Sequence, residues 1–397
     1  MGGGMYTFVW LALAHAVADF YANYVPTYGA LRECTPEQVR MLGLIVAISG
    51  IVGNALQPLA GFLGDKLGQK WIIVAGLLLA GLLCPSFTLF GFSMLAIGIC
   101  SVVGKAGIAF FHPCAAALAR RVWTRHKQLS ISFFIVGGSL GFALSPWGFS
   151  TVLRLTGERW TFLLCVPALL LCPVLARVLP GGHGYEQAVS GTDLRTFLRE
   201  RWRPLTAVYF AVVFRVFTEF SLVFAIPFIC RERGYPMWTV EGGALFLVVL
   251  CSSGGMLLSG WLSTRFARSR VCILSMALSL VALLAFLLSP HVLGPGHLWL
   301  NLVLLGLGTG LAGAVNPLLV GEAQDIMPRF SGFLSACSMG AAWAVGSVAP
   351  GLYAAIAAWL YRTRPAGYAS GYGHAMIITT FFLLPAMLCV MLLRRRR

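Results

Sequence analysis

The run GFLGDKLGQK occupies residues 61–70 and separates two long apolar stretches of the chain. The stretch before it, at about 39–62, and the stretch after it, at about 71–90, each hold the roughly 20 mostly apolar residues that a helix needs to cross a bilayer. Between them lie glycines, one acid and two lysines, which suit a short charged loop at a membrane surface. This stretch therefore predicts helices that span a membrane and are joined by short loops.

The same pattern repeats along the whole chain. Its composition is 58% hydrophobic and 11% charged, whereas a soluble domain carries roughly 25% charged residues. An ordinary soluble enzyme and a disordered chain are both excluded. The apolar runs are continuous and lack the alternation of a transmembrane barrel. We predict an all-α polytopic membrane protein with twelve transmembrane helices, at about 6–28, 39–62, 71–90, 92–119, 128–153, 159–179, 204–228, 240–264, 271–290, 297–321, 330–358 and 374–393.

The charges indicate how the chain is oriented. Lys and Arg number 29 against 13 Asp and Glu, a formal net charge of +16. When the N-terminus is placed in the cytoplasm, most basic residues fall in the inner segments, including the C-terminal run at 394–397. Cytoplasmic loops of membrane proteins are rich in Lys and Arg. We predict a multi-pass protein of the cell inner (plasma) membrane with both termini cytoplasmic. Anionic inner-leaflet lipid then explains the basic balance, and a nucleic-acid partner is not needed.

Several features recur in order at an almost constant offset along the chain. They are His15-x-x-x-Asp19 and Arg215-x-x-x-Glu219; the run 61–70 and the run 260–269; His112-Pro113 and Asn316-Pro317; and Pro146 and Pro350. This recurrence indicates a duplicated six-helix unit. We predict an N-terminal half at 1–179, a cytoplasmic linker at 180–203 and a C-terminal half at 204–397. Parallel six-helix halves around a midplane site are typical of one large class of secondary transporters.

The run 61–70 resembles the loop motif between helices 2 and 3 of the major facilitator superfamily. The matching positions are Gly61, Gly64, Asp65, Lys66, Gly68 and Lys70. More narrowly, the chain resembles the fosmidomycin-resistance branch in its His15…Asp19 pattern and in LQPLAGFLGDK (56–66), FHPCAAALARR (111–121), VGGSLGFALSP (136–146) and EAQDIMPRFSG (322–332). The resemblance implies the major facilitator fold, drug or metabolite efflux with drug resistance, and a conformational gating role for the six motif residues. Two departures are Cys114, where branch members often carry an acid, and Lys105, an added membrane cation.

Ionisable side chains inside the predicted helices are the candidate coupling groups. Charge in a bilayer is costly and usually faces a cavity or a partner. His15 and Asp19 are four residues apart and therefore share one helix face. Histidine titrates near neutral pH. We predict that Asp19, His15 and Glu219 couple transport to protons. The alternative is that His15 with Asp19, and Arg215 with Glu219, only neutralise each other or lock neighbouring helices together.

Four further residues are predicted to bind substrate. Lys105 lies in mid-helix, where it either binds substrate or pairs with Asp19. Arg215 offers a planar fork suited to a carboxylate or phosphonate. His112 and Asn316 each precede a proline, which frees a backbone carbonyl and bends the helix. For His112, donation to that freed carbonyl is the competing interpretation.

These features predict a secondary active transporter rather than an enzyme. We expect proton-coupled efflux, by antiport, of a small anionic or amphipathic drug or metabolite through alternating access. The alternatives are a divalent-metal exporter and an uncoupled uniporter of organic anions. The chain has no P-loop, and no GxSxG or HExxH motif supports an intramembrane enzyme. We expect no cofactor and no resident metal, and we expect a monomer.

Overall fold

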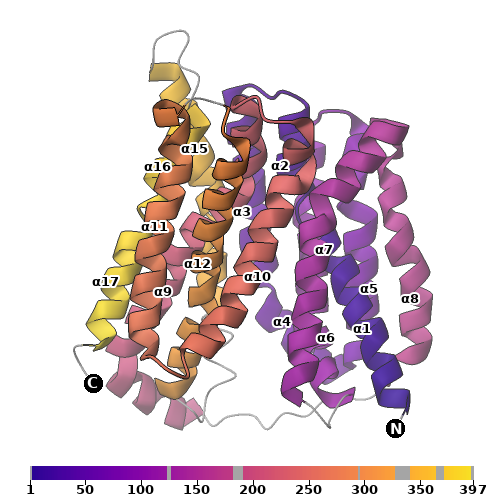
Figure 1. Cartoon of the computed structure of the whole chain (residues 1–397). Helices are drawn as coiled ribbons and strands as arrows, with labels where there is room; N and C mark the ends of the chain where they lie inside the picture. The colour runs from indigo at the N-terminus through magenta and orange to yellow at the C-terminus, as the bar shows by residue number, and fades with distance from the viewer. Residues whose placement is uncertain are drawn as a thin grey trace. The chain divides into compact units, whose positions relative to one another are not determined.

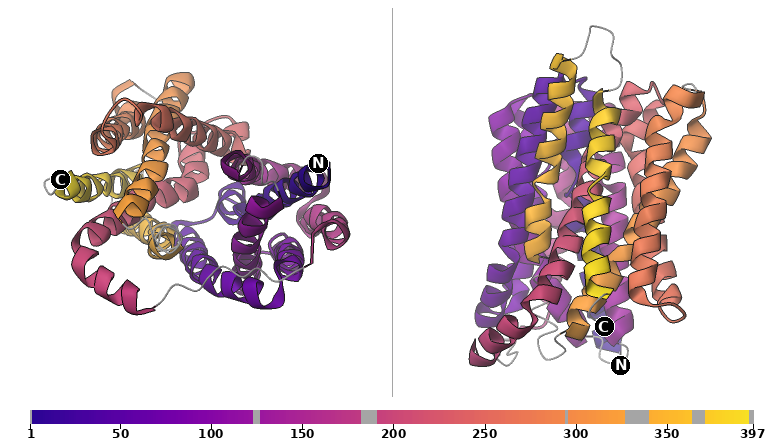
Figure 2. Two further views of the ribbon diagram at one scale, coloured as in Figure 1. Left: turned by 90° about the horizontal axis from the view of Figure 1, so that it is seen from below. Right: turned by 90° about the vertical axis from the view of Figure 1, so that its left-hand side faces the viewer.

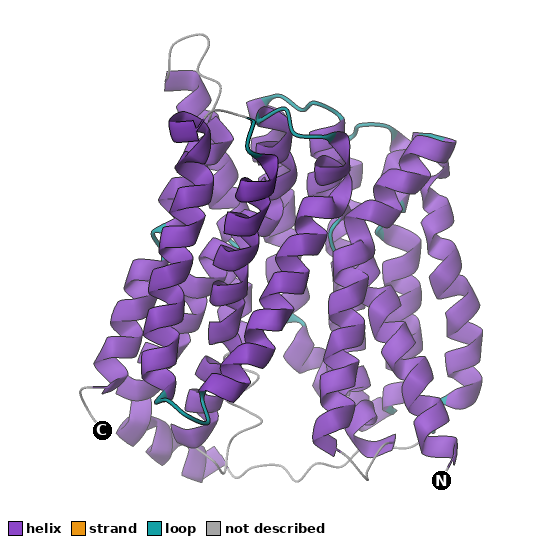
Figure 3. Cartoon of the chain, viewed as in Figure 1, coloured by secondary structure: helices purple, strands orange, loops and turns teal. Residues whose placement is uncertain are grey.

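The computed structural model describes residues 2–122, 127–181, 191–293, 296–326, 340–363 and 371–394. These ranges are mostly helical, with short loops and turns, and contain no strand (Figure 3). The described residues include twelve helical segments long and apolar enough to cross a membrane, which confirms the predicted fold class. The segments are Gly4–Leu31, Pro36–Gly64, Gln69–Phe90, Met94–Ala119, Phe133–Thr156, Glu158–Val178, Arg201–Glu232, Thr239–Leu262, Arg268–Pro290, Leu298–Ile326, Ala342–Thr363 and Gly371–Leu393.

The chain divides into two compact units. The first comprises Met1–Arg32 with Ile48–Glu186, and the second comprises Glu33–Ala47 with Gln187–Arg397. Helix α3 (Pro36–Ala55) therefore contributes to both units. Within the predicted linker, residues 182–190 lie outside the described residues, and residues 191–203 form the first turns of a long helix. Two more predicted segments begin or end outside the described part: the helix expected at 330–358 and the motif at 322–332.

The helices of the first unit pack side by side around α1, α5 and α6 (Figure 1). Helix α1 packs against α7 and α6, and α5 packs against α6 and α8. The bounds are α1 (Gly2–Phe20), α2 (Tyr24–Leu31), α4 (Gln57–Leu67), α5 (Gln69–Leu83), α6 (Met94–Val122), α7 (Lys127–Thr156) and α8 (Val166–Val178). Two short 3-10 segments, Ser86–Phe90 and Glu158–Cys165, complete this unit.

The second unit repeats the use of long packed helices (Figure 2). Helix α10 packs along α12, α11 packs against α12 and α17, and α9 packs against α17. The bounds are α9 (Gly191–Glu232), α10 (Ala244–Leu262), α11 (Arg268–Leu293), α12 (Leu298–Ile326), α14 (Ala342–Gly346), α15 (Ala349–Thr363), α16 (Gly371–Thr380) and α17 (Leu383–Arg394). A π-helical segment, Thr239–Gly243, precedes α10. The buried core of the second unit includes Val212, Val216, Leu318 and Leu383.

Small residues bring α1 and α7 into close contact. A Cβ on Gly137 would lie 2.9 Å from the carbonyl oxygen of Ala12, and a Cβ on Gly141 would overlap the carbonyl of Ala16. In lipid, helix association depends on close packing rather than on the hydrophobic effect, so glycines at such contacts allow the backbones to approach. The result fixes α7 directly against the face of α1 that carries the ionisable residues.

Two helices contain an internal proline directly after a predicted site residue. Pro113 lies within α6, and Pro317 lies within α12. Each proline removes one backbone donor and leaves an upstream carbonyl without its usual partner. Such interruptions are tolerated in membrane helices where neighbouring groups satisfy the backbone. His112 and Asn316 therefore stand at equivalent interruptions of their helices.

Candidate functional site

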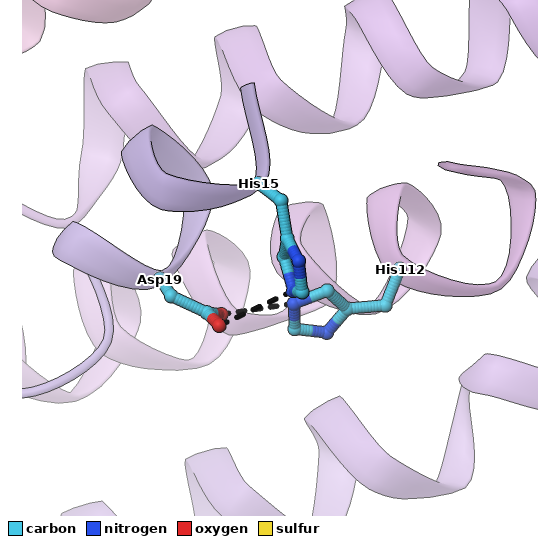
Figure 4. A group of neighbouring side chains, drawn as sticks. All are labelled: His15, Asp19 and His112. Atoms are coloured by element: carbon cyan, nitrogen blue, oxygen red, sulfur yellow. Dashed lines mark hydrogen bonds and ion pairs between the residues drawn. The ribbon is translucent and has the colours of Figure 1, made fainter. Parts of the chain in front are cut away.

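Three ionisable side chains of the first unit converge at one point (Figure 4). His15 and Asp19 come from α1, and His112 comes from α6. The Nε2 atom of His15 lies 3.3 Å from Oδ2 of Asp19, and the Nε2 atom of His112 lies 2.9 Å from Oδ1. Asp19 therefore faces a different imidazole with each of its two oxygens. The side chain of Asp19 is 18% exposed, so most of the carboxylate is shielded from surrounding solvent or lipid.

His15 has a second polar contact through its other ring nitrogen. Its Nδ1 atom lies 2.7 Å from the backbone carbonyl oxygen of Phe134 on α7. The imidazole also stacks on the Phe134 ring, with ring centroids 4.0 Å apart. A carbonyl oxygen only accepts hydrogen bonds, so the Nδ1 atom of His15 donates. The ring is thus fixed in both position and orientation.

Lys105 places a cation on the same helix as His112. The two residues are seven apart, about two turns of helix, and so lie on similar faces of α6. Lys105 is half-buried and packs beside Gly53 of α3. Among the described residues, no carboxylate lies within ion-pair distance of its ammonium group. The predicted alternative of a direct pair with Asp19 is not formed, and Lys105 is available to attract an anion.

The second unit contains a related arrangement. Arg215 donates to Oε2 of Glu219 at 2.6 Å and to Oδ1 of Asn316 at 3.4 Å. The Arg215 side chain is 1% exposed, whereas that of Glu219 is 29% exposed. As in the first unit, a pair four residues apart on one helix contacts the residue before a proline on another. Here the guanidinium charge is balanced within the protein by Glu219.

A small cavity lies next to Glu219 in the second unit. It measures ≈ 20 Å³, and Thr218, Ser252 and Thr309 line it together with Glu219 and apolar side chains. This volume has room for about one water molecule. The cavity has room for a water beside the Glu219 carboxylate and is too small for a drug-sized solute.

The chain matches the sequence profile of the Major Facilitator Superfamily over residues 5–350. The chain belongs to the Major Facilitator Superfamily. This membership makes the protein a transporter of small molecules rather than an enzyme and confirms the predicted family.

Two curated relatives match this major facilitator protein along most of its length. The fosmidomycin resistance protein of Escherichia coli (strain K12) is 22% identical, over 87% of this chain and 85% of its own length. The uncharacterized MFS-type transporter YfnC of Bacillus subtilis (strain 168) is 25% identical, over 85% of this chain and 83% of its own length. Both similarities span the two predicted halves.

Solved structures with the same fold include two transporters. A bacterial homolog of the human lysosomal transporter Spinster, in an inward-facing and occupied conformation, has a TM-score of 0.78 at 16% identity and covers 100% of this chain and 97% of its own. The D323A mutant of the nucleoside transporter NupG has a TM-score of 0.78 at 14% identity and covers 98% of this chain and 99% of its own. At these identities the similarity establishes the fold.

The glycines of the superfamily motif pack α4 tightly. Gly68, between α4 and α5, has φ 92° and ψ 133°, a backbone conformation that favours glycine. A Cβ on Gly64 would lie 2.5 Å from Sγ of Cys114, and a Cβ on Gly61 would lie 3.8 Å from Cβ of Pro113. The small residues of the motif thus allow α4 to approach α6 next to the proline interruption.

The two lysines of the motif make aromatic contacts. The Nζ atom of Lys66 lies 4.6 Å from the ring centroid of Phe62, and that of Lys70 lies 5.4 Å from the centroid of Trp71. Asp65 belongs to α4, and the prediction for its side chain lies outside the described part of the structure. The gating role of these residues stays a prediction.

The first-unit cluster also has the composition of a metal site. One ligand atom from each of His15, Asp19 and His112 lies within 4.8 Å of the other two. Imidazole and carboxylate are ordinary ligands of transition metals, so this major facilitator could hold a divalent ion there by geometry. The positive charge of Lys105 on the same helix opposes a metal cation.

Sequence reasoning did not identify the role of Phe134. Its contact with His15 is made by a backbone carbonyl, which every residue type carries, so no side-chain pattern marks it. Sequence reasoning also left open whether His112 donates to the carbonyl freed by Pro113. In the structure, His112 contacts the carboxylate of Asp19.

Proposed function

We propose that this protein is a proton-coupled exporter that exchanges protons for a small anionic or amphipathic drug or metabolite by alternating access. The observation that carries the proposal is the partly buried Asp19 carboxylate, each oxygen of which meets an imidazole. Imidazole and carboxylate are both groups that bind and release protons. Coupling requires such a group to bind protons differently in the two states of the transporter. A relative named for fosmidomycin resistance supports drug efflux.

Each predicted site residue has a place in this proposal. Asp19 and His15 are the principal coupling groups. Glu219, whose charge Arg215 balances, is the second candidate. We propose that Lys105 and His112 of the first unit bind an anionic part of the solute, and that Arg215 and Asn316 are the substrate-binding residues of the second unit.

Exchange needs the solute and the proton to compete. An anion and a proton attract each other. An anion that binds only at Lys105 would therefore favour retention of the proton. Competition arises when a solute also carries a hydrogen-bond donor that reaches Asp19 and takes the place of the proton. We therefore propose a solute with an anionic end for Lys105 and a donor group for Asp19.

The first experiment identifies a solute. Thermal stabilisation of the purified protein is measured with fosmidomycin, phosphonates, organic acids, lipophilic cations and divalent metals. A stabilising compound is then used in proteoliposomes with an imposed pH gradient. Parent protein is expected to move it against its concentration gradient, and Asp19→Asn is expected to lose the response to the pH gradient.

A matched control comes from an exposed ion pair of the same unit. Glu158 pairs with Arg32 at 2.7 Å, and both side chains are partly exposed. Glu158→Gln should retain coupled transport. If Asp19→Asn transports as well as the parent protein over a range of pH, the assignment of Asp19 is wrong. If the solute is moved equally with and without a gradient by the parent protein, the protein is a uniporter.

A divalent-metal exporter is the second candidate, favoured by the three converging groups at His15, Asp19 and His112. Stabilisation by Zn²⁺ or Mn²⁺ that disappears in His15→Ala would support it. Stabilisation by organic anions alone would exclude it in favour of the first candidate.

We also propose the orientation and surroundings of the protein. Both termini lie in the cytoplasm of a cell with this protein in its inner membrane, and the halves at 1–179 and 204–397 act as one monomer. Arg201 and Arg203, both exposed at the start of α9, contact anionic inner-leaflet lipid. A C-terminal reporter active only in the cytoplasm tests the orientation, and mass measurement in nanodiscs tests the monomer.

A further inference from the structure

We propose that α7 fixes one proton on the His15–Asp19 pair: the carbonyl of Phe134 sets which nitrogen of His15 donates, and Gly138 supplies the space in which the pair meets. The significance for transport depends on the proposed function, but the arrangement itself is a property of the folded first unit. Phe134 and Gly138 are thus positioning residues for the coupling pair.

The hydrogen-bond directions require this proton. Because the carbonyl of Phe134 accepts at 2.7 Å, the Nδ1 atom of His15 carries a hydrogen. In a neutral imidazole the other nitrogen then has only a lone pair. That nitrogen, Nε2, faces Oδ2 of Asp19 at 3.3 Å. Two lone pairs would repel, so we infer that a proton lies between the two atoms, either on His15 beside a carboxylate or on Asp19 beside a neutral imidazole.

His112 does not need such an additional proton. Its Nε2 atom lies 2.9 Å from Oδ1 of Asp19, and a neutral imidazole can donate from Nε2 while Nδ1 keeps its lone pair. The two histidines therefore differ in kind although both contact Asp19. The carbonyl of Phe134, which is absent from the surroundings of His112, makes the difference.

Other charged groups near the pair come from α6. Among the described side chains, His112 and Lys105 are the further ionisable groups that interact with Asp19. The described parts of α5, α7 and α8 also pack on α1, and the charged partners found for Asp19 come from α1 and α6. Among the described residues around Asp19, the contact with His15 is therefore the one that needs an additional proton.

Gly138 provides the space for this contact. A Cβ there would lie 2.5 Å from Oδ2 of Asp19 and 2.5 Å from Nε2 of His15, far inside van der Waals contact. The clash would fall on the ends of two side chains rather than on backbone, so an alanine should displace the pair without preventing folding. Gly137, next to it, faces the backbone carbonyl of Ala12 instead.

Movement of α7 along α1 would change both features together. It would remove the carbonyl of Phe134 from His15 and the space at Gly138 from the pair. His15 could then turn and donate from Nε2 to Asp19 as a neutral imidazole, and the required proton could leave. A change of proton affinity between two helix positions is what couples proton binding to conformation.

The test is nitrogen NMR of protein labelled with ¹⁵N-histidine in lipid nanodiscs, with the His15 signals assigned by their loss in His15→Gln. In the parent protein and in Asp19→Asn, we expect Nδ1 of His15 to carry hydrogen. In Asp19→Asn, Nε2 should have no hydrogen, because the asparagine amide can donate to it. A hydrogen on Nε2 with a bare Nδ1 in either protein would overturn the proposal.

Two alanine variants on α7 test its role. Gly138→Ala should lose the single Nδ1-protonated population of His15, whereas Leu140→Ala, at a side chain that is 48% exposed, should retain it. If Gly138→Ala matches the parent spectrum, the positioning role is wrong. If Gly138→Ala does not fold, the Asp19→Asn spectrum still decides the first step. Should that spectrum agree while Asp19→Asn transports like the parent protein, the proposed function fails and the inference about α7 stands.

Discussion

Asn316 accepts a long hydrogen bond of 3.4 Å from Arg215. In the repeated sequence pattern Asn316 corresponds to His112 of the first unit, which contacts Asp19. In each unit, the residue before an in-helix proline reaches a pair spaced four residues apart on another helix. The chemistry differs because the pair that Asn316 contacts is an arginine with a carboxylate, whereas the cluster that includes His112 holds two imidazoles and a carboxylate. We therefore expect the principal proton coupling in the first unit and keep Glu219, whose charge Arg215 balances, as the second candidate.

Breaking the Arg215–Glu219 pair should destabilise the protein. Arg215 is 1% exposed, so Glu219→Gln leaves a buried cation without its counter-charge. We expect the free energy of unfolding to fall by about 1–3 kcal/mol. This is below the roughly 3–5 kcal/mol for breaking a fully buried pair, because Glu219 keeps partial exposure. The double variant Arg215→Met with Glu219→Leu should recover most of the lost stability, which denaturation in mild detergent measures.

The exposed pair Arg32–Glu158 provides the comparison. Both side chains are partly exposed, and such pairs contribute about 0–1 kcal/mol. Glu158→Gln should therefore change stability less than Glu219→Gln does. Equal losses at the two sites would contradict a special role for burial at Arg215.

Adjacent glycines on α10 should respond oppositely to alanine. A Cβ on Gly255 would overlap the carbonyl of Gly310 on α12, whereas nothing lies within 4 Å of a Cβ on Gly254. Overpacking costs about 1–3 kcal/mol, so Gly255→Ala should destabilise the second unit. Gly254→Ala should be neutral or stabilise by up to about 1 kcal/mol, because alanine favours helix. Unfolding of the two variants in parallel gives the result, and equal effects would argue against the close α10–α12 contact.

Removing Lys105 should weaken anion binding. Charge-assisted hydrogen bonds contribute about 1.5–3 kcal/mol, so Lys105→Met should lower the affinity for a stabilising organic anion at least about tenfold. Lys105→Arg should keep part of it. The motif lysine Lys66 is exposed on α4, and Lys66→Met serves as the control with unchanged affinity. Ligand-dependent thermal shifts measure all three, and an unchanged affinity in Lys105→Met would remove Lys105 from the site.

The sequence predicts the helices and the first pair well, for physical reasons. Apolar length alone indicates the spans, and a spacing of four places His15 and Asp19 on one face. The partner His112 depends on how α6 packs against α1, which the sequence indicates only through membrane cost and the adjacent proline. The contact to Phe134 is beyond sequence reasoning, because a backbone carbonyl has no residue signature. Lys105 shows the same limit, since its distance from Asp19 depends on tertiary packing.

The two histidines should differ when each is replaced by glutamine. His112 acts through one donor to Asp19, and a glutamine amide can also donate. His112→Gln should therefore keep pH-dependent exchange with at most about a tenfold loss, because it retains part of the about 1.5–3 kcal/mol that a hydrogen bond to a charged group contributes. His15→Gln removes the titratable partner that α7 orients, so the response to a pH gradient should be lost. Transport in proteoliposomes over a range of pH separates the two. If coupling is lost only in His112→Gln, the coupling proton belongs to the contact between His112 and Asp19 and not to the contact between His15 and Asp19.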